Sequence, residues 1–294
     1  MTFLIIDASN MIHRYFHALP ELSTQSGIKT HAVAGWIGLL VNVTERLNLP
    51  KDTAVVVFWD KAGKADSEGE SAPEWYKSQR ESKDPSLYEQ ITVAMALTKM
   101  LGFAYVGKAG VEADSLIGSF VLSRPEDRHY ILSSDKDMLQ LVNDQVSVVV
   151  MNGADVKVMD AAGVEKKWGV KPSQMADLLI LMGDKSDNIP GVPGIGQKTA
   201  QELLNKWGSL TEVYKNVSQL KPAQRNRLLE AEEKIPLYRQ LIEFKLAEVK
   251  VKQEAPDFKA AKKLMRQLEM VKAVQRVEHM QAEMLTGKRK MATV

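Results

Sequence analysis

The sequence predicts an α/β fold with a mostly parallel central sheet flanked by helices. Short and nearly continuous apolar runs recur along the first half of the chain, and helical patterns lie between them. Strands that are buried on both faces have such runs, and alternation of strand and helix is typical of a parallel sheet covered on both sides. The runs are Phe3–Ile6, Ala54–Trp59, His129–Leu132 and Val146–Met151, and the helical patterns span about residues 30–48, 87–101 and 113–123.

The amino-acid composition excludes several classes of protein. The chain has 294 residues, of which 45% are apolar, and this is enough material for a packed core. It has no cysteine, which excludes disulfides, thiolate zinc sites and cysteine nucleophiles. No apolar run reaches the roughly 18–20 residues of a membrane helix, and the start MTFLIIDASN lacks the basic segment of a secretory signal. We therefore expect a cytoplasmic protein with no membrane partner.

Changes in composition and hydrophobic pattern divide the chain into three parts. Residues 1–170 form the α/β core, and the polar stretch 61–90 within it is long for a loop, so it is expected to be functional or disordered. Residues 171–246 are helical and contain a segment rich in glycine and proline. Residues 247–294 predict one basic amphipathic helix and a frayed tail.

Charge is unevenly distributed along the chain. From Lys250 to the end there are 11 basic and 5 acidic residues, whereas the preceding part has 28 basic and 32 acidic residues. A basic tail on a mildly acidic body indicates a polyanionic partner for the tail.

Acidic residues follow the ends of the predicted strands. Asp7, Asp60 and Asp135 stand at or just past three of these ends. Because the carboxyl ends of parallel strands meet at one edge of a sheet, we expect these side chains to converge there. Each aspartate taken alone is more simply explained as a helix cap or the start of a turn, but three at one sheet edge indicate a shared role. The remaining acidic candidates form pairs with one of these or with each other: Glu112 with Asp114, Asp135 with Asp137, and Asp184 with Asp187.

Eight carboxylates at one sheet edge would repel each other unless cations lay among them. Oxygen ligands favour Mg²⁺ or Mn²⁺, and the five histidines show no metal-ligand spacing that would indicate zinc. Two such ions about 4 Å apart are the arrangement that catalyses phosphodiester hydrolysis. The pattern therefore predicts a two-ion hydrolytic centre.

Glycines also mark a second candidate site. Gly191, Gly194 and Gly196 directly precede a helical pattern that contains Lys198. Such glycines let backbone N–H groups approach a phosphate, and the helix N-terminus favours an anion. The spacing fits neither a P-loop nor a dinucleotide-binding turn. We interpret the segment as a helix-hairpin-helix clamp on a nucleic-acid backbone, and an ordinary helix–helix turn stays open as the alternative.

Six segments together resemble one family. They occur in the family's order and cover about residues 2–240: LIIDASNMIHRYFHALP, VVVFWDKAGK, EWYKSQR, GVEADSLIG, LSSDKDMLQLV and LMGDKSDNIPGVPGIGQKTAQELL. The chain resembles the flap endonuclease/5′→3′ exonuclease superfamily, above all the N-terminal 5′-nuclease domain of bacterial DNA polymerase I and free-standing phage and bacterial 5′ nucleases. The resemblance implies a PIN-like core, a helical arch within residues 61–90 and a C-terminal helix-hairpin-helix subdomain.

The resemblance also implies an activity. The protein would be a divalent-metal-dependent phosphodiesterase that acts near the 5′ ends of branched or nicked duplex DNA in replication or repair. Its cofactors would be two Mg²⁺ or Mn²⁺ ions, together with a K⁺ ion at the helix-hairpin-helix motif. Its partners would be DNA with flaps, nicks or ends, and a replication polymerase, and the protein itself would be a monomer.

Residue roles are carried over position by position. Lys77 on the arch would lie near the scissile phosphate, with Arg80 steering the 5′ strand, and both would act in catalysis with Asp7 and Asp135. His13, Arg14 and Tyr15 are secondary candidates for DNA contacts. The first ion would be held by Asp7, Asp60, Glu112 and Asp114, and the second by Asp135, Asp137, Asp184 and Asp187. The DNA contacts would come from Arg14, Lys77, Arg80, Gly191, Gly194, Gly196 and Lys198.

Two features depart from the family pattern. Ser115 stands where the family has a further aspartate after Glu-Ala-Asp, and fewer anionic ligands weaken metal binding. The 61–90 segment holds 5 basic and 7 acidic residues, so it attracts DNA poorly except around Lys77 and Arg80. A DNA-structure-binding protein with reduced or lost catalysis is therefore the alternative function. A related metal-dependent RNase is a third one, although such an enzyme would not need the glycine hairpin.

Overall fold

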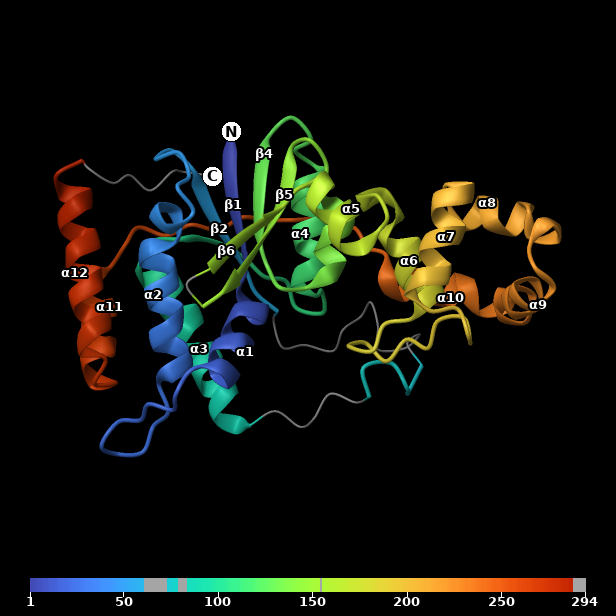
Figure 1. Ribbon diagram of the computed structural model, residues 1–294. Coiled ribbons are helices and arrows are strands. Elements are labelled where there is room, and N and C mark those ends of the chain that lie inside the picture. Colours follow the sequence, from blue (N-terminus) through green and yellow to red (C-terminus); the bar gives the residue numbers. More distant parts are fainter. Residues whose placement is uncertain (61–72, 79–83, 154, 288–294) are drawn as a thin grey trace.

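A six-stranded sheet forms the centre of the molecule. The computed structural model describes residues 1–60, 73–78, 84–153 and 155–287, and the strand order is β3-β2-β1-β4-β5-β6 (Figure 1). Neighbouring strands are parallel from β3 through β5, and β6 pairs antiparallel with β5 at the edge. The strands are β1 (Thr2–Asp7), β2 (Ala54–Phe58), β3 (Ala104–Val106), β4 (Arg128–Leu132), β5 (Val146–Asn152) and β6 (Asp155–Met159).

Helices cover both faces of the sheet. Alternate side chains of each strand point to opposite faces, and in β1 the side chains on both faces are apolar and buried. Leu4 and Ile6 of β1 are buried against one group of helices, and Phe3 and Ile5 are buried against the other. The first group is α1 (Ala8–Ala18), α2 (His31–Arg46) and α3 (Pro85–Met100). The second group is α4 (Ala113–Leu122), α5 (Ala161–Trp168), and two 3₁₀ helices at Lys136–Leu141 and Pro172–Gln174.

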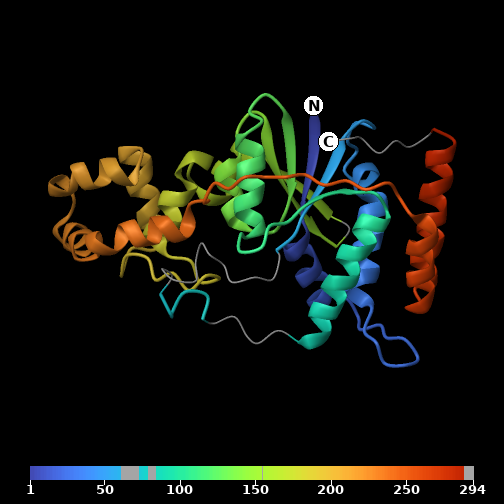
Figure 2. The same ribbon diagram turned by 180° about the vertical axis from the view of Figure 1, so that it is seen from behind.

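The rest of the chain forms two helical extensions at opposite ends of the molecule (Figures 1 and 2). Residues 243–257 run between them and pair with β3 through backbone hydrogen bonds between Lys252 and Tyr105. No helix in the described ranges is long and apolar enough to cross a membrane. One extension contains α6 (Met175–Met182), α7 (Gln197–Trp207), α8 (Leu210–Lys215), α9 (Pro222–Ala231) and α10 (Ile235–Ile242), with short 3₁₀ turns at Val217–Gln219 and Glu232–Lys234, and the other contains α11 (Phe258–Gln267) and α12 (Val271–Leu285).

The structure confirms the predicted α/β class and the four predicted strands, but it corrects two local expectations and adds three elements. The C-terminal region is two helices rather than one, because the chain turns at Glu269, whose φ is 56°. The apolar face of this hairpin packs on α2 and α3, with Val277 fully buried and Val271 exposed. Residues 73–78 form turns, and Lys77 has a φ of 54°, so the helix expected there is absent from this described stretch of the arch. Helix α1 and strands β3 and β6 were not predicted.

Candidate active site

The predicted convergence of carboxylates begins at the end of β1. Parallel pairing places Asp7 beside Phe58 of β2, and Ile6 beside Leu132 of β4, so the residues after these strands share one edge of the sheet. Asp7 is 6% exposed. Its Oδ1 accepts a hydrogen bond from the Asn10 backbone at 3.1 Å, and its Oδ2 accepts one from Ser133 Oγ at 2.8 Å.

A cavity of about 680 Å³ opens at this edge. Six of the eight predicted carboxylates line it, and they come from five separate stretches of the sequence. Backbone N–H groups orient two of these carboxylates: Ala113 N donates to Asp60 Oδ1 at 2.7 Å, and Asp137 N donates to Asp135 Oδ1 at 3.0 Å. The Asp135 backbone is held in turn, because its N–H donates to Ser133 Oγ. The six are Asp7, Asp60, Glu112, Asp114, Asp135 and Asp187.

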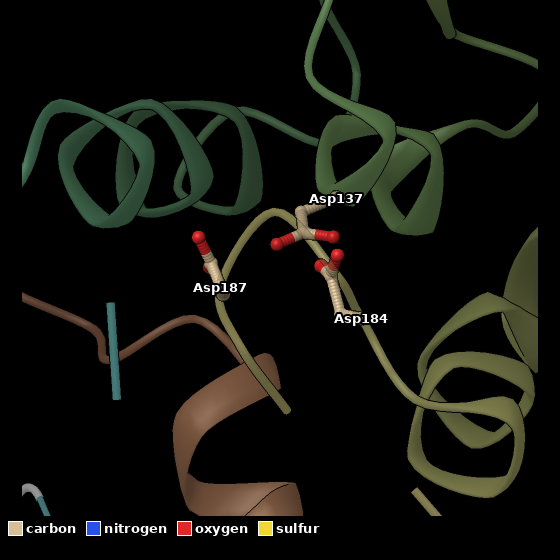
Figure 3. A group of neighbouring side chains, drawn as sticks. All are labelled: Asp137, Asp184 and Asp187. Atoms are coloured by element: carbon tan, nitrogen blue, oxygen red, sulfur yellow. The ribbon is translucent and has the colours of Figure 1, made fainter. Parts of the chain in front are cut away.

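A second group of carboxylates adjoins this cavity. Asp137, Asp184 and Asp187 each offer an oxygen within 4.8 Å of the other two (Figure 3). Asp137 comes from the 3₁₀ helix after β4, and the other two come from the loop after α6. Asp187 belongs to both groups, so all eight predicted ligands lie in one continuous acidic region.

The loop that carries Asp184 and Asp187 depends on two glycines. Backbone hydrogen bonds in both directions between Asp184 and Ile189 close it into a tight hairpin. Gly183 and Gly191 have φ values of 82° and 68° and cross so closely that a Cβ on Gly191 would lie 2.3 Å from the Gly183 nitrogen. Glycine is therefore the only residue that fits at these two positions.

Burial makes this region electrostatically unfavourable without cations. Loss of solvation, together with the charges of Asp60 and Asp135, raises the pKa of Asp7 to about 7 against the lowering effect of its hydrogen bonds with Asn10 and Ser133. Burial, followed by the charge of Glu112, raises the pKa of Asp114 to about 7. Burial, followed by the charge of Asp135, raises the pKa of Asp137 well above its usual range.

Two lysines partly compensate these charges. Lys77 Nζ lies 2.7 and 2.8 Å from the two oxygens of Glu112, and Lys136 Nζ lies 2.7 Å from Asp184 Oδ1. Burial alone would raise the pKa of Asp184, but its hydrogen bonds with Lys136 and Ser186 lower it instead. Asp137 has no such partner: its Oδ1 is buried without a hydrogen bond. An oxygen-only donor set with an unpartnered buried oxygen fits a hard divalent cation.

The described part of the arch is attached to the second carboxylate group. Lys77 N donates to the Asp187 carbonyl at 3.0 Å, and Asn188 Nδ2 donates to the Trp75 carbonyl at 2.6 Å. The Trp75 ring also packs edge-on against Tyr238 of α10. Lys77 thus lines the cavity, whereas Arg80 is outside the described residues.

Several predicted DNA-contact residues do not line the cavity: Arg14, Gly191, Gly194, Gly196 and Lys198. The glycine segment joins α6 to α7, Gly196 immediately precedes α7, and Lys198 is exposed. Arg227 of α9 packs on Gly194 and donates to its carbonyl at 2.7 Å, a contact that sequence reasoning missed. Arg14 is half-buried on α1, and it is not among the residues that line the cavity.

Aromatic and histidine side chains of α1 also line the cavity. They are His13, Phe16 and His17, and Asp84 and Leu87 at the start of α3 line it as well. Of the α1 residues only His13 was a sequence candidate, and the signal for Phe16 and His17 was their spacing of three and four from His13 along one helix face.

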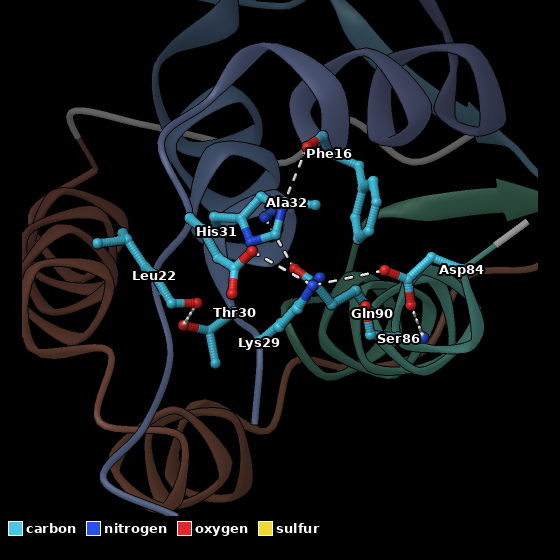
Figure 4. Close-up of polar contacts among 10 residues, drawn as sticks. Phe16, Leu22, Lys29, Thr30, His31, Ala32, Asp84, Ser86 and Gln90 are labelled. Carbon is cyan, nitrogen blue, oxygen red and sulfur yellow. Dashed lines mark hydrogen bonds and ion pairs between the residues drawn. The ribbon is translucent and has the colours of Figure 1, made fainter. Parts of the chain in front are cut away.

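Hydrogen bonds fix this wall by tying the starts of α2 and α3 together (Figure 4). His31 Nε2 lies 3.1 Å from the Phe16 carbonyl, and Ala32 N donates to Gln90 Oε1 at 2.8 Å. Lys29 reaches Asp84, which caps α3 through Ser86 N.

Comparison with known proteins agrees with this geometry. The family model of the N-terminal resolvase-like domain of 5′-3′ exonucleases matches residues 2–169, and the model of their C-terminal SAM fold matches residues 170–265. The chain belongs to the 5′-3′ exonuclease family. Membership makes it a nuclease, and the resemblance seen in the sequence is confirmed.

Relatives of this nuclease occur both free-standing and inside larger proteins. It is 34% identical to the 5′-3′ exonuclease of Aquifex aeolicus over 283 residues, which cover 94% of this chain and 95% of that one. It is 36% identical to thermostable DNA polymerase I of Thermus aquaticus over 228 residues, which cover 77% of this chain and 26% of the polymerase. The chain therefore spans about a quarter of the polymerase relative.

Solved structures show the same fold at lower identity. T5 5′-exonuclease with divalent metal ions (zinc) bound matches with a TM-score of 0.67 and 20% identity, over 97% of this chain and 99% of that one. The catalytic core of Rad2 in complex with DNA substrate matches with a TM-score of 0.61 and 16% identity, over 95% and 92% of the two chains. The α/β sheet with its helical extension is thus the architecture of these nucleases.

Proposed function

We propose that this exonuclease is a divalent-metal-dependent 5′ nuclease that hydrolyses phosphodiester bonds near the 5′ ends of branched or nicked duplex DNA. Its ions would be two Mg²⁺ or Mn²⁺. The observation that supports this most strongly is the meeting of eight carboxylates in one acidic region next to a 680 Å³ cavity. A polymerase partner, the monomeric state and the K⁺ ion stay predictions.

The proposed ligands form two adjacent sets, one for each ion. Asp7, Asp60, Glu112 and Asp114 would hold the first ion, and Asp135, Asp137, Asp184 and Asp187 the second. When bound, the two ions would supply an activated water and neutralise the charge of the reacting phosphate. Ser133 and the Asn10 backbone each hold one oxygen of Asp7, so this carboxylate is aimed before any ion arrives.

Positive groups of the chain would bind the substrate. Lys77 enters the cavity from the arch, and its ammonium would turn from Glu112 to a substrate phosphate once an ion covers that carboxylate. The hairpin before α7 presents exposed Gly194 and Gly196, and the first turn of α7 presents exposed Lys198; these groups suit a DNA backbone. His13 and Phe16 line the cavity, so their rings would contact a nucleobase that entered it.

The test is cleavage of a labelled 5′-flap duplex with and without Mg²⁺. Asp7→Asn and Asp135→Asn should each abolish cleavage while leaving DNA binding near the wild-type level. Asp144→Asn is the matched control, because this carboxylate is exposed in a turn away from the cavity. Cleavage in EDTA, or full activity of Asp7→Asn, would contradict the proposal.

Ser115 supports the rival function, a binding protein with weakened catalysis. It lines a small cavity of about 20 Å³ together with Glu112, Asp114, Asp137 and Asp187, so an aspartate there would face the ions. We expect Ser115→Asp to lower the Mg²⁺ concentration needed for cleavage. Binding of the flap without cleavage at any Mg²⁺ or Mn²⁺ concentration would favour the rival instead.

A further inference from the structure

Lys136 brings a positive charge into the second carboxylate group, and the proposed function does not use it. It stands between Asp135 and Asp137, and its side chain reaches the loop after α6. Its Nζ donates to Asp184 Oδ1 at 2.7 Å and to Ser186 Oγ at 2.5 Å. Because the Asp184 side chain is 2% exposed, the ion pair neutralises an anion that has almost no access to water.

The carboxylates of this group are unequally supplied with hydrogen-bond donors. Asp184 Oδ1 accepts from Lys136 and from both N and Oγ of Ser186. Asp137 Oδ1, in the same group, is buried without any hydrogen bond. The group therefore carries one ammonium on Asp184 and an open oxygen on Asp137.

A lysine and a divalent ion compete for such a group. An ion held by Asp184 would share that carboxylate with the Lys136 ammonium, and the two like charges repel each other strongly where water is scarce. The Lys136 side chain is 21% exposed and ends a flexible four-carbon stem, so its ammonium can withdraw into water without movement of the backbone.

We propose that Lys136 is a displaceable counter-cation of the Asp137, Asp184 and Asp187 group. It balances charge in the metal-free protein and leaves Asp184 when a divalent ion binds. The inference rests on the proposed function, because it requires that the group bind such an ion. Its consequence is that Lys136 sets the ion affinity, since each binding event includes the loss of the Lys136–Asp184 pair.

Amine labelling of the wild-type protein tests the displacement directly. Acetic anhydride is applied in EDTA and in Mg²⁺ without DNA, and the modified lysines are quantified by mass spectrometry. We expect Mg²⁺ to increase acetylation of Lys136 several-fold and to leave the exposed neighbour Lys185 unchanged. Equal or lower labelling of Lys136 in Mg²⁺ would overturn the inference.

Calorimetric titration with Mn²⁺ tests the effect on affinity. Lys136→Met keeps the aliphatic stem and removes the charge, so its dissociation constant for one ion should fall at least tenfold. Lys185→Met should match the wild type, and Asp137→Asn identifies the responding site by weakening it. Unchanged or weaker binding by Lys136→Met refutes the counter-cation while the proposed function stands. Absence of Mn²⁺ binding in every variant, wild type included, refutes both. If Lys136→Met does not fold, the acetylation experiment on the wild-type protein alone tests whether Lys136 is displaced.

Discussion

Replacing Asp7 by asparagine should stabilise the metal-free protein, although it should also abolish catalysis. Burial raises the pKa of Asp7 to about 7, whereas an unfolded aspartate titrates at about 3.9. Between these two values the folded state binds more protons than the unfolded state, so stability falls as the pH rises from about 4 to about 7 and falls no further above that. A shift of about three units corresponds to a loss of about 4 kcal/mol at pH 8.

Asparagine keeps the shape of Asp7 and its Oδ1 acceptor for the Asn10 N–H, but it has no charge to bury. Its amide group can donate to Ser133 Oγ, so the loss of the original hydrogen bond should offset only about 1 kcal/mol. We therefore expect Asp7→Asn to exceed the wild type by about 3 kcal/mol at pH 8 in EDTA, and the two proteins to be nearly equal at pH 4.

Urea unfolding at several pH values in EDTA measures this difference. Asp144→Asn should follow the wild type at every pH, because Asp144 is exposed. Saturating Mg²⁺ should stabilise the wild type at pH 8 and leave Asp7→Asn with a much smaller gain. If Asp7→Asn is no more stable than the wild type at pH 8 in EDTA, the assigned burial of charge at the end of β1 is wrong.

Three further changes test the scaffold. Gly191→Ala should cost about 3 kcal/mol or more in the free energy of unfolding, because its Cβ would collide with the Gly183 backbone; urea unfolding measures this loss. Met265→Ala in α11 empties a fully buried position and should cost about 2–5 kcal/mol in the same assay, while cleavage by the folded enzyme stays unchanged. Asn188→Ala and Asn188→Gly both remove the hydrogen bond to the Trp75 carbonyl, and both should speed proteolysis near residues 73–78. Faster proteolysis of the alanine variant alone would instead reflect the left-handed backbone of Asn188, whose φ is 59°.

The sequence predicted the buried strands of the sheet well because their apolar runs are long and continuous. It missed β3, which has only three residues, and β6, whose exposed edge gives no such run. The signal for β6 was the Asn152-Gly153 pair between two β-rich stretches, which is typical of a tight hairpin. The break at Glu269 had no signal, because nothing in a helical apolar pattern marks a non-glycine residue with a positive φ.

The two lysine contacts at the site were beyond the reach of sequence reasoning. Lys136 lies 48 residues from its partner Asp184, and Lys77 lies 35 residues from Glu112. Their partners follow from the folding of two loops onto the sheet edge, and neither pair has a characteristic spacing. Lysines between acidic residues are ordinarily read as solvated.

Capping and ion binding, which the sequence presents as alternatives for each aspartate, are compatible in the structure. Asp7 caps α1 through Asn10 N, and Asp135 caps the 3₁₀ helix through Asp137 N. Asp60 accepts from Ala113 N at the start of α4. In each case Oδ1 accepts a backbone N–H in the first turn of a helix, and this hydrogen bond fixes the direction of the carboxylate. A helix start at the carboxyl end of a parallel strand would therefore hold a metal-binding carboxylate rigidly at the sheet edge, as we propose for Asp7, Asp60 and Asp135.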